Sequence, residues 1–355
     1  MDEIKYRRAS RSDYRAINDF YNRIYGRSRS MEEFEWEFHE GPAGPSVYII
    51  ALDGEKIVGT NCVILITMIH VDGREILSGK SEDTLVDPEY RGKRIFAKIY
   101  KKLIEECKSE GVEVIWGFTP VARAFEKIGF EVPFSNLQSL VVLNVGGAYH
   151  YLSGLNPKNS NTDRLKILGL AIMSRGKSMF TSNPRSKSLQ LLERNEPANL
   201  KELIGEEVKK IDGGLAIEQG AEYQKWRYSD NPHLHNPQFL EFSNNGSPIG
   251  YAVINVTDEK VCYISEIKFY WDVEDSLRRS AIQLLVDFIK GKGACLVRNW
   301  HFANNQVGQR DIRVTKESGF TLLDRGSHFV WMNLTENSLS PNNLILTIAA
   351  TQGLK

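Results

Sequence analysis

The residues best suited to binding chemistry lie in the segment VDPEYRGKRIF, at positions 86–96. Arg91, Lys93 and Arg94 crowd three cations around Gly92, and such charges repel one another unless water or an anion relieves them. The segment leads from a strand-like run into a helical pattern, so the first N–H groups of that helix point into the turn. With the helix dipole, they predict a site for a pyrophosphate that the backbone approaches closely at Gly92.

The segment differs from two common phosphate-binding motifs. It lacks the Gly-Lys-Ser/Thr ending of the P-loop, and it lacks the three spaced glycines of the dinucleotide fingerprint. A basic surface turn with no ligand is the alternative interpretation of these residues.

Hydrophobic spacing predicts the elements that position this loop. Residues 81–86 form a fourth strand, and the amphipathic pattern over 95–109 is a helix that Gly111 ends. Asp53-Gly54 and Asp72-Gly73 are hairpin signals between the preceding strands. The remaining predicted elements are a strand at 4–9, helices at 12–25 and 31–39, and a strand at 112–118. This order predicts an α/β (α+β) fold with a mixed, mostly antiparallel sheet flanked by helices.

Composition excludes several classes of protein. The 355 residues carry 45 basic and 45 acidic side chains, so nothing indicates bulk nucleic-acid binding. The four cysteines are scattered, which argues against a disulfide framework and against a zinc site, and we expect no metal. The polar N-terminus does not resemble a signal peptide, and apolar runs are far shorter than the roughly 20 residues of a membrane span. A cytoplasmic location is the default expectation.

The sequence also contains a weak internal repeat. Trp36 matches Trp226, Gly59 matches Gly250 and Gly129 matches Gly319, at offsets of 190, 191 and 190 residues. WGF at 116–118 resembles WHF at 300–302, at an offset of 184 residues. We therefore predict two copies of one fold in tandem. The second copy has FYWDVEDSLRR where the first has the glycine-containing basic loop, so only the first copy keeps the predicted phosphate site.

Between the copies lies a basic segment. From Asn156 to Arg194 there are eight Lys or Arg residues against Asp163 and Glu193, with a helical apolar piece at 165–173. We interpret it as a solvated linker, and as an alternative it offers a positive rim for a phosphate-bearing substrate or a peripheral contact with an anionic membrane. The expected domains are 1–145, a basic linker at 146–214, a second copy at 215–335 and a tail at 336–355.

VDPEYRGKRIFAKIYKKL, preceded by SEDTL and followed by WGF and AFEKIGFEV, resembles the GNAT superfamily of acyl-CoA N-acyltransferases. The resemblance covers residues 1–145 closely and 215–335 only in architecture. The family motif is Arg/Gln-x-x-Gly-x-Gly/Ala after the fourth strand. Arg94 stands where this motif has its first glycine, and Phe96 where it has Gly or Ala, so we expect a cradle of different shape.

The resemblance implies how acetyl-CoA would bind as a cosubstrate. Main-chain groups of Leu85 and Val86 would contact the pantetheine arm beside a splay between the fourth and fifth strands. The main-chain amides of the loop would hold the pyrophosphate, and these belong to Arg91, Gly92, Lys93, Arg94, Ile95 and Phe96.

Acetyl transfer to an amine needs a group that accepts a proton and one that protonates the departing thiolate. Glu82 and Asp83 are adjacent on the fourth strand and are expected on opposite faces, so that only one faces the cleft. We favour Glu82 as the base, because family members often place a carboxylate there, with a purely structural role for both as the alternative. The tyrosine acid of the family falls at Phe125, which has no proton to donate, so another tyrosine, or main-chain donors and water, must serve.

These features predict an N-acetyltransferase acting on a primary amine of a small molecule. A nucleotide-linked amino sugar for surface polysaccharide is the first hypothesis for the acceptor, motivated by the basic linker. A peptidoglycan-bridge-type aminoacyl transferase and a non-catalytic acyl-CoA-binding module are the alternatives. The oligomeric state stays open.

Overall fold

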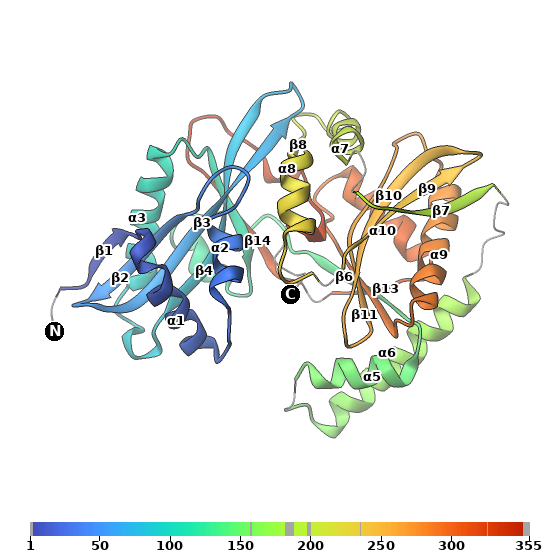
Figure 1. Cartoon of the computed structure of the whole chain (residues 1–355), viewed down its shortest axis with the longest axis horizontal. Helices are drawn as coiled ribbons and strands as arrows, with labels where there is room; N and C mark the ends of the chain where they lie inside the picture. Colours follow the sequence, from blue (N-terminus) through green and yellow to red (C-terminus); the bar gives the residue numbers. More distant parts are fainter. Residues whose placement is uncertain are drawn as a thin grey trace. The chain divides into compact units, whose positions relative to one another are not determined.

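The computed structural model describes residues 3–156, 158–181, 188–196, 200–234, 236–324 and 326–350. They form two compact units, each assembled from separate stretches of the chain (Figure 1). Unit 1 consists of the described residues within 1–134, 215–232 and 327–343. Unit 2 consists of the described residues within 135–214, 233–326 and 344–355.

Unit 1 is built on a mixed sheet in the order β1-β2-β3-β4-β5-β14. Its strands are β1 (Lys5–Arg8), β2 (Val47–Asp53), β3 (Lys56–His70), β4 (Glu75–Val86), β5 (Val114–Thr119), β8 (Leu215–Ile217) and β14 (His328–Asn333). Its α-helices are α1 (Tyr14–Tyr25), α2 (Met31–Phe38), α3 (Ile95–Ser109), α4 (Ala122–Glu126) and α8 (Ala221–Gln224). Only the β4–β5 pair is parallel among those recorded in this sheet, and hairpins join β2 to β3 and β3 to β4 at the two predicted Asp-Gly turns.

Helix α3 packs on one face of this sheet. Ile95, Ile99 and Leu103 recur at helical spacing and are buried against Val47, Ile49 and other side chains of the strands. The close approach requires Gly59, because a Cβ there would lie 2.9 Å from side-chain atoms of both Ile95 and Ile99. The N-terminus of α3 is thereby fixed beside the end of β4.

Unit 2 repeats this architecture on a sheet in the order β13-β6-β12-β11-β10-β9-β7. Its strands are β6 (Leu137–Val142), β7 (Leu189–Arg194), β9 (Gln238–Asn244), β10 (Ser247–Val256), β11 (Val261–Phe269), β12 (Leu296–His301) and β13 (Thr321–Leu323). The two-residue strand β15 (Leu344–Ile345) is not part of this sheet. Its α-helices are α5 (Val145–Gly154), α6 (Asn161–Phe180), α7 (Leu200–Val208), α9 (Asp275–Gly291) and α10 (Gln306–Glu317). The β11–β12 pair is parallel, as β4–β5 is in unit 1.

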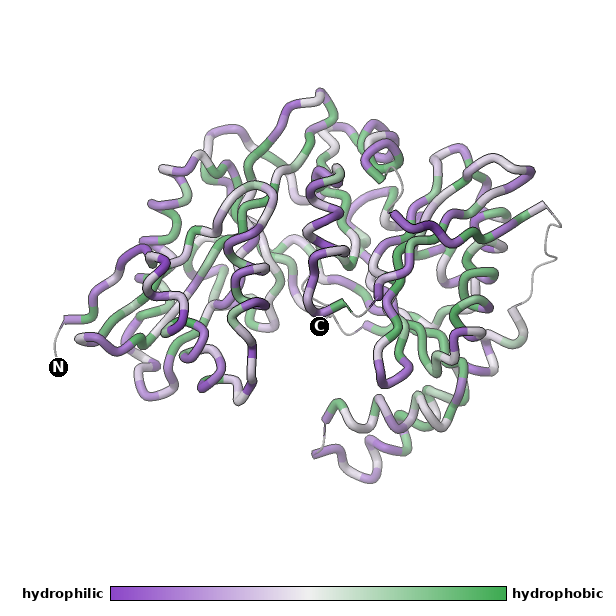
Figure 2. The backbone as a smooth tube through the Cα atoms, in the orientation of Figure 1, coloured by the Kyte–Doolittle hydropathy of each residue, from purple (hydrophilic) through white to green (hydrophobic). Residues whose placement is uncertain are grey.

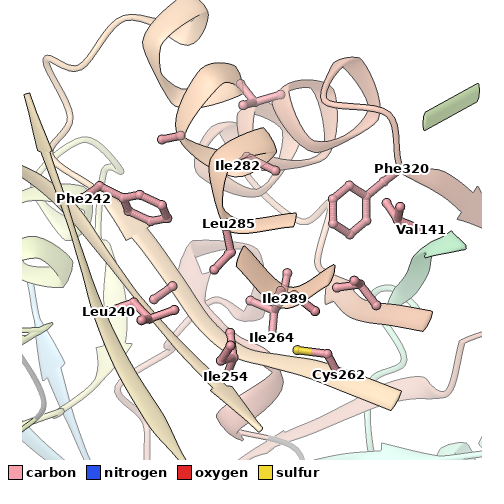
Figure 3. Close-up of a cluster of buried hydrophobic side chains, with 14 of the residues drawn as sticks. Val141, Leu240, Phe242, Ile254, Cys262, Ile264, Ile282, Leu285, Ile289 and Phe320 are labelled. Atoms are coloured by element: carbon pink, nitrogen blue, oxygen red, sulfur yellow. The ribbon is translucent and has the colours of Figure 1, made fainter. Parts of the chain in front are cut away.

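The core of unit 2 lies between α9 and the sheet (Figure 3). Ile282, Leu285 and Ile289 of α9 point toward Leu240 and Phe242 of β9 and toward neighbouring strands. Hydrophobic residues are concentrated on the strands, whereas hydrophobic and hydrophilic residues alternate along the helices (Figure 2). The mixed, mostly antiparallel sheets and their flanking helices confirm the predicted fold class, and two similar units confirm the tandem arrangement.

The two copies exchange their last strands. β14 comes from the C-terminal copy but pairs antiparallel with β5 of unit 1, whereas β6 comes from the N-terminal copy but pairs antiparallel with β12 of unit 2. The two exchanged strands lie 191 residues apart at both ends, in agreement with the repeat offset. The sequence-based boundaries at 145, 214 and 335 run consecutively along the chain, and the units depart from them because each sheet is completed by a distant segment.

The segment expected to be a linker contributes regular elements to unit 2. α5 and α6 form a helical hairpin at the periphery of this unit, and α6 packs against β6 (Figure 1). β7 extends the sheet by pairing antiparallel with β9. Residues 182–187 and 197–199 of the predicted linker, and 351–355 of the predicted tail, lie outside the described residues.

Strand exchange predicts that Trp331, a fully buried residue of β14, stabilises unit 1 although it belongs to the C-terminal copy. Trp331→Ala should cost about 3 to 5 kcal/mol of unfolding free energy, because the cavity is poorly refilled. Hydrogen exchange followed by mass spectrometry should then show faster exchange in β5. Trp300→Ala in β12 is the matched control and should instead affect unit 2. Unchanged protection of β5 in Trp331→Ala would contradict the exchanged pairing.

Candidate functional site

The predicted phosphate loop joins the end of β4 to the start of α3. Asp87 begins it, and its side chain accepts a hydrogen bond from Glu89 N at 3.1 Å and pairs with Arg23 at 3.0 Å. These partners lower the pKa of the Asp87 carboxyl despite its burial, which opposes the shift. A short 3₁₀ turn, Pro88–Tyr90, follows, and Tyr90 donates to Asp53 at 2.7 Å. The loop is therefore tied to the sheet at its beginning, while Arg91, Gly92, Lys93 and Arg94 are exposed.

The backbone of the loop turns twice through the left-handed region before the helix starts. Gly92 has φ +82°, and Arg94, the N-cap of α3, has φ +58°. Arg94 thus adopts the conformation for which the family motif uses glycine, at a cost of about 1 to 2 kcal/mol for a residue with a Cβ. No side chain caps this helix, and the N–H groups of Ile95, Phe96 and Ala97 have no acceptor within the first turn.

The reason for glycine at position 92 differs from our expectation. A Cβ at Gly92 would find no protein atom within 4 Å, so no neighbouring atom of the chain requires glycine at this position. What requires glycine is the positive φ of the backbone there. Phe96, the second departure from the motif, points its ring toward Tyr100 and Phe125, at centroid distances of 4.8 and 5.5 Å. Its large side chain therefore packs against neighbouring rings, and the main-chain N–H stays at the mouth of the helix.

β4 and β5 diverge beside the loop. Their recorded pairing covers only Ser78 to Lys80 on β4 and Val114 to Trp116 on β5, although both strands continue. Main-chain groups of Leu85 and Val86 lie in the part of β4 beyond this pairing. A groove of about 1000 Å³ opens in the same unit, lined by Arg94, Phe96 and Ala97 of the α3 terminus, by residues 120–124 and 126–128, and by His328.

The two candidate carboxylates share one face of the sheet, which corrects the prediction that they face opposite ways. The β3–β4 register shifts by one residue between Thr60 and Cys62, and Asp83 has φ +48°. This bulge places an extra residue in β4 and cancels the normal alternation of side chains. Periodicity alone gave the wrong orientation, because nothing in a strand pattern marks a bulge formed without glycine.

Asp83 and Glu82 have different environments on that face. Asp83 is 9% exposed, pairs with Arg29 at 2.8 Å and accepts from the Tyr48 hydroxyl at 2.9 Å. Burial raises the pKa of Asp83, and the Arg29 guanidinium opposes this shift. The Glu82 side chain is 27% exposed and contacts Lys80 Nζ at 2.5 Å. Burial lowers the pKa of Lys80, while Glu82 counteracts it. Glu82 is therefore the carboxylate that a ligand can reach, and Asp83 is held by Arg29.

Tyr100 brings a hydroxyl next to the position of the missing tyrosine. It lies on α3 with its ring 5.4 Å from that of Phe125. Its hydroxyl is 2.8 Å from Ser81 Oγ and 3.0 Å from Thr84 Oγ1, on the part of β4 that has left β5. Burial raises the pKa of Tyr100 to about 12, so the phenol keeps its proton at neutral pH. The buried Asn61 Nδ2 beside this cluster finds no hydrogen-bond partner among the described residues.

Sequence reasoning missed Lys80, Arg29 and Tyr100. Lys80 was detectable in principle, because it lies two residues before Glu82 on a strand and therefore points to the same face. Arg29 and Asp83 are 54 residues apart, and Tyr100 approaches Ser81 only because α3 packs on this sheet. No local pattern signals these two contacts.

The corresponding loop of unit 2 is filled by arginine. Arg278 of α9 donates to the carbonyls of Val273 and Tyr270, at 2.9 and 2.8 Å. Arg310 donates to the carbonyls of Trp271 and Val273, both at 2.8 Å, and pairs with Asp275 at 2.7 Å. Carbonyl groups therefore point into this loop and bind cations of the chain itself, which is the opposite polarity to a phosphate cradle.

The divergence of strands is also filled in unit 2. β11 and β12 pair only from Val261 to Tyr263 and from Leu296 to Arg298. The helical turn Ile348–Ala350 packs against both strands, and Thr347 Oγ1 donates to Glu266 at 2.7 Å. The cavity left there measures about 50 Å³, room for a water molecule or two. The second copy thus keeps the fold while the chain itself occupies the place of a ligand.

Neither a metal cluster nor a membrane-spanning helix occurs among the described residues. Within the described ranges, no three His, Cys, Asp or Glu side chains are grouped closely enough to hold a metal ion. None of the described helices combines the length and apolarity needed to cross a membrane.

The contrast between the carboxylates can be measured as stability. Asp83→Asn should lower the unfolding free energy by about 3 to 5 kcal/mol, because it leaves the buried Arg29 guanidinium without its nearest anion. Asp19→Asn, at an exposed position of α1, is the matched control and should stay within about 0.5 kcal/mol of the parent. Urea denaturation measures both. Equal effects of the two substitutions would show that the Asp83–Arg29 pair does not hold this part of the unit.

Comparison with known proteins agrees with this geometry. The model of the acetyltransferase (GNAT) domain matches residues 5–132, whereas no curated protein matches the sequence significantly. A GCN5-related N-acetyltransferase from Anabaena variabilis has a similar structure, with a TM-score of 0.62 at 12% identity over 94% of this chain and 73% of its own. A tandem GNAT protein from the clavulanic acid biosynthesis pathway gives a TM-score of 0.58 at 10% identity over 95% of this chain and 100% of its own.

A probable N-acyltransferase from Enterococcus faecalis is also similar, with a TM-score of 0.60 at 9% identity over 94% of this chain and 73% of its own. At such identities these structures establish the fold, and the matched domain establishes the family of the first copy. Residues 5–132 therefore carry an acetyltransferase (GNAT) domain, and the chain as a whole has the fold of GNAT N-acetyltransferases, a tandem GNAT protein among them.

Proposed function

We propose that unit 1 transfers an acetyl group from acetyl-CoA to a primary amine of a small molecule. The observation that carries the proposal is the coincidence, in one unit, of an uncapped helix terminus, diverging strands and an open groove. Unit 2 has both corresponding places filled by its own side chains and backbone. We therefore expect one cofactor site per chain.

The residues present fit the cofactor. Main-chain N–H groups at the start of α3 would hold its pyrophosphate, with Arg91, Lys93 and Arg94 as exposed counter-charges. The unpaired edge of β4 at Leu85 and Val86 would bind the amides of the pantetheine arm, and Phe96 and Ala97 would line the groove beside it. When bound, acetyl-CoA supplies the acyl group as a thioester.

Glu82 acts as the base in this proposal. An amine is mostly protonated at neutral pH and becomes a nucleophile only when it loses a proton. Glu82 is the reachable carboxylate of its face, and its contact with Lys80 fixes the side chain beside the point where β4 and β5 separate.

Tyr100 supplies the proton for the leaving thiolate. Its hydroxyl contacts Ser81 and Thr84 at the beginning of the divergence, and its raised pKa keeps it a donor. Thr84 is a partly exposed residue whose hydroxyl contacts that of Tyr100, so it can relay a proton between Tyr100 and the groove side of β4. Phe125 is then part of the aromatic packing that positions Tyr100 and has no chemical role of its own.

The acceptor is defined here as a primary amine of a small molecule. A nucleotide-linked amino sugar stays our hypothesis for its identity, and its support is the basic character of the 156–194 segment.

The decisive assay incubates the full chain with acetyl-CoA and a panel of amines that includes nucleotide-linked amino sugars, and follows free thiol. Calorimetry with coenzyme A should give one site per chain. Amine-dependent thiol release supports the enzyme, binding without turnover indicates an acyl-CoA-binding module, and absence of binding refutes the proposal.

Gly92→Val should weaken coenzyme A binding by at least about tenfold, because a β-branched residue is strained at φ +82° and shifts the amides of the cradle. Gly73→Val is the matched control, since Gly73 has φ +88° in the β3–β4 turn and suffers the same strain away from the loop. Titration calorimetry compares the two. Equal affinities for coenzyme A would count against the cradle.

Glu82→Gln should lower kcat by about 10²- to 10⁴-fold, the usual contribution of a general base. The deficit should shrink as the pH rises toward the pKa of the acceptor amine, because less proton transfer is then needed. Glu105→Gln, an exposed carboxylate of α3, is the control and should leave the rate unchanged. A deficit that is the same at every pH would assign Glu82 a structural role.

Tyr100→Phe should reduce kcat about 10²-fold or more while the KM for acetyl-CoA changes little, since only the departing thiolate loses its donor. A thioester with a more acidic thiol needs less protonation, and its turnover should be less affected by the substitution. Tyr6→Phe, at a partly buried residue of β1, is the control. Identical losses for both thioesters would point to packing and not to proton donation.

A further inference from the structure

Helix α6 carries an apolar stripe on its outer side. Leu165, Ile172 and Met179 repeat at intervals of seven residues and are 68%, 56% and 64% exposed, and Met173 beside them is 58% exposed. Gly169 and Gly176 complete the stripe, and nothing lies within 4 Å of where their Cβ atoms would be. Single exposed apolar residues are common, but a continuous row along a twenty-residue helix marks an interaction surface.

Basic side chains border the stripe on both sides. At about 100° per residue, Arg164 and Arg175 fall on one flank, and Lys166 falls on the other flank. Lys166 is highly exposed, and the hairpin region 145–181 contains five basic residues against a single acid, Asp163. This arrangement, an apolar strip between two cationic borders, is typical of helices that lie in a membrane interface.

The opposite side of α6 anchors the helix to unit 2. Ala171 and Ser174 are fully buried, and Ser174 Oγ accepts from Val142 N of β6 at 3.3 Å. Lys177 Nζ donates to Phe320 O at 2.5 Å. The stripe faces outward because the opposite face of α6 packs against β6 and neighbouring residues. Figure 2 shows hydrophobic and hydrophilic residues interleaved along both helices of the hairpin, as an amphipathic pair requires.

Charge decides between the partners that an apolar stripe could take. A second copy of this chain would bring an equally basic hairpin against the first, and the flanking cations would repel one another. A bilayer with anionic headgroups offers apolar chains for the stripe and negative charge for its borders, and long Lys and Arg side chains can extend toward the headgroups.

We propose that α6 docks the protein onto an anionic phospholipid surface, with Leu165, Ile172, Met173 and Met179 inserted between headgroups and the flanking Arg and Lys residues paired with phosphates. This inference rests on unit 2 and is independent of the acetyl transfer proposed for unit 1. It would confine the enzyme to the membrane surface, where acceptors with a lipid or membrane-bound carrier reside.

The test is sedimentation of the full chain with vesicles of phosphatidylcholine alone or mixed with phosphatidylglycerol. The protein should sediment with the mixed vesicles at least about tenfold more strongly than with neutral ones, and high salt should reduce binding. Leu165→Glu combined with Ile172→Glu should abolish binding. These side chains are exposed, so circular dichroism and thiol-release activity toward a soluble acceptor should be retained.

A charge-matched pair separates local from overall electrostatics. Arg164→Gln with Arg175→Gln should weaken binding to mixed vesicles about tenfold, whereas Lys108→Gln with Lys290→Gln, at exposed ends of α3 and α9, should not. Failure to bind mixed vesicles, equal binding to neutral vesicles, or equal effects of the two pairs would each overturn the proposal. A dimer in light scattering that Leu165→Glu with Ile172→Glu disrupts would overturn it too, by assigning the stripe to a second copy.

Discussion

The candidate site depends on the early end of pairing between β4 and β5. Two parallel strands that separate after three residue pairs leave main-chain donors and acceptors unpaired along β4, which a buried sheet does not tolerate without a ligand, water or another segment to satisfy them. The bulge at Asp83 belongs to the same stretch, because it bends β4 and brings two carboxylates to one face. α3 starts where β4 ends, so the helix terminus, the unpaired edge and the groove adjoin as a consequence of connectivity.

In the second copy, segments of the chain itself fill the space where the parallel strands separate. β11 and β12 separate at the same place, but the segment around Thr347 and Ile348 packs there. The loop before α9 turns its carbonyls inward and binds Arg278 and Arg310. The fold thus persists with either a ligand site or a self-contained filling, which is why the fold alone does not establish an activity.

Exchange of the last strands ties the two copies together along the chain. β14 completes the sheet that contains the candidate site, and Phe329 stacks on Phe134 within unit 1 at a centroid distance of 4.6 Å. Trp36 and Trp226, which are equivalent in the repeat, also meet within unit 1, where each indole N–H donates to the main-chain carbonyl of the other at 2.8 and 2.9 Å. Unit 1 therefore requires residues of the C-terminal copy, so that copy contributes to the architecture of the unit that holds the candidate site.

The sequence alone determined the elements around the loop, the family and the asymmetry between the copies, because these depend on local features. Hydrophobic spacing defined β4 and α3, the Asp-Gly turns defined the hairpins, and the cations around Gly92 distinguished the first loop from the second. The tertiary structure decided which side chains meet. The bulge at Asp83, the Arg29 pair, the approach of Tyr100 to Ser81 and the exchange of β6 and β14 join residues distant in sequence or break a periodic pattern. Such contacts depend on packing and on backbone conformation at single residues, which periodicity does not encode.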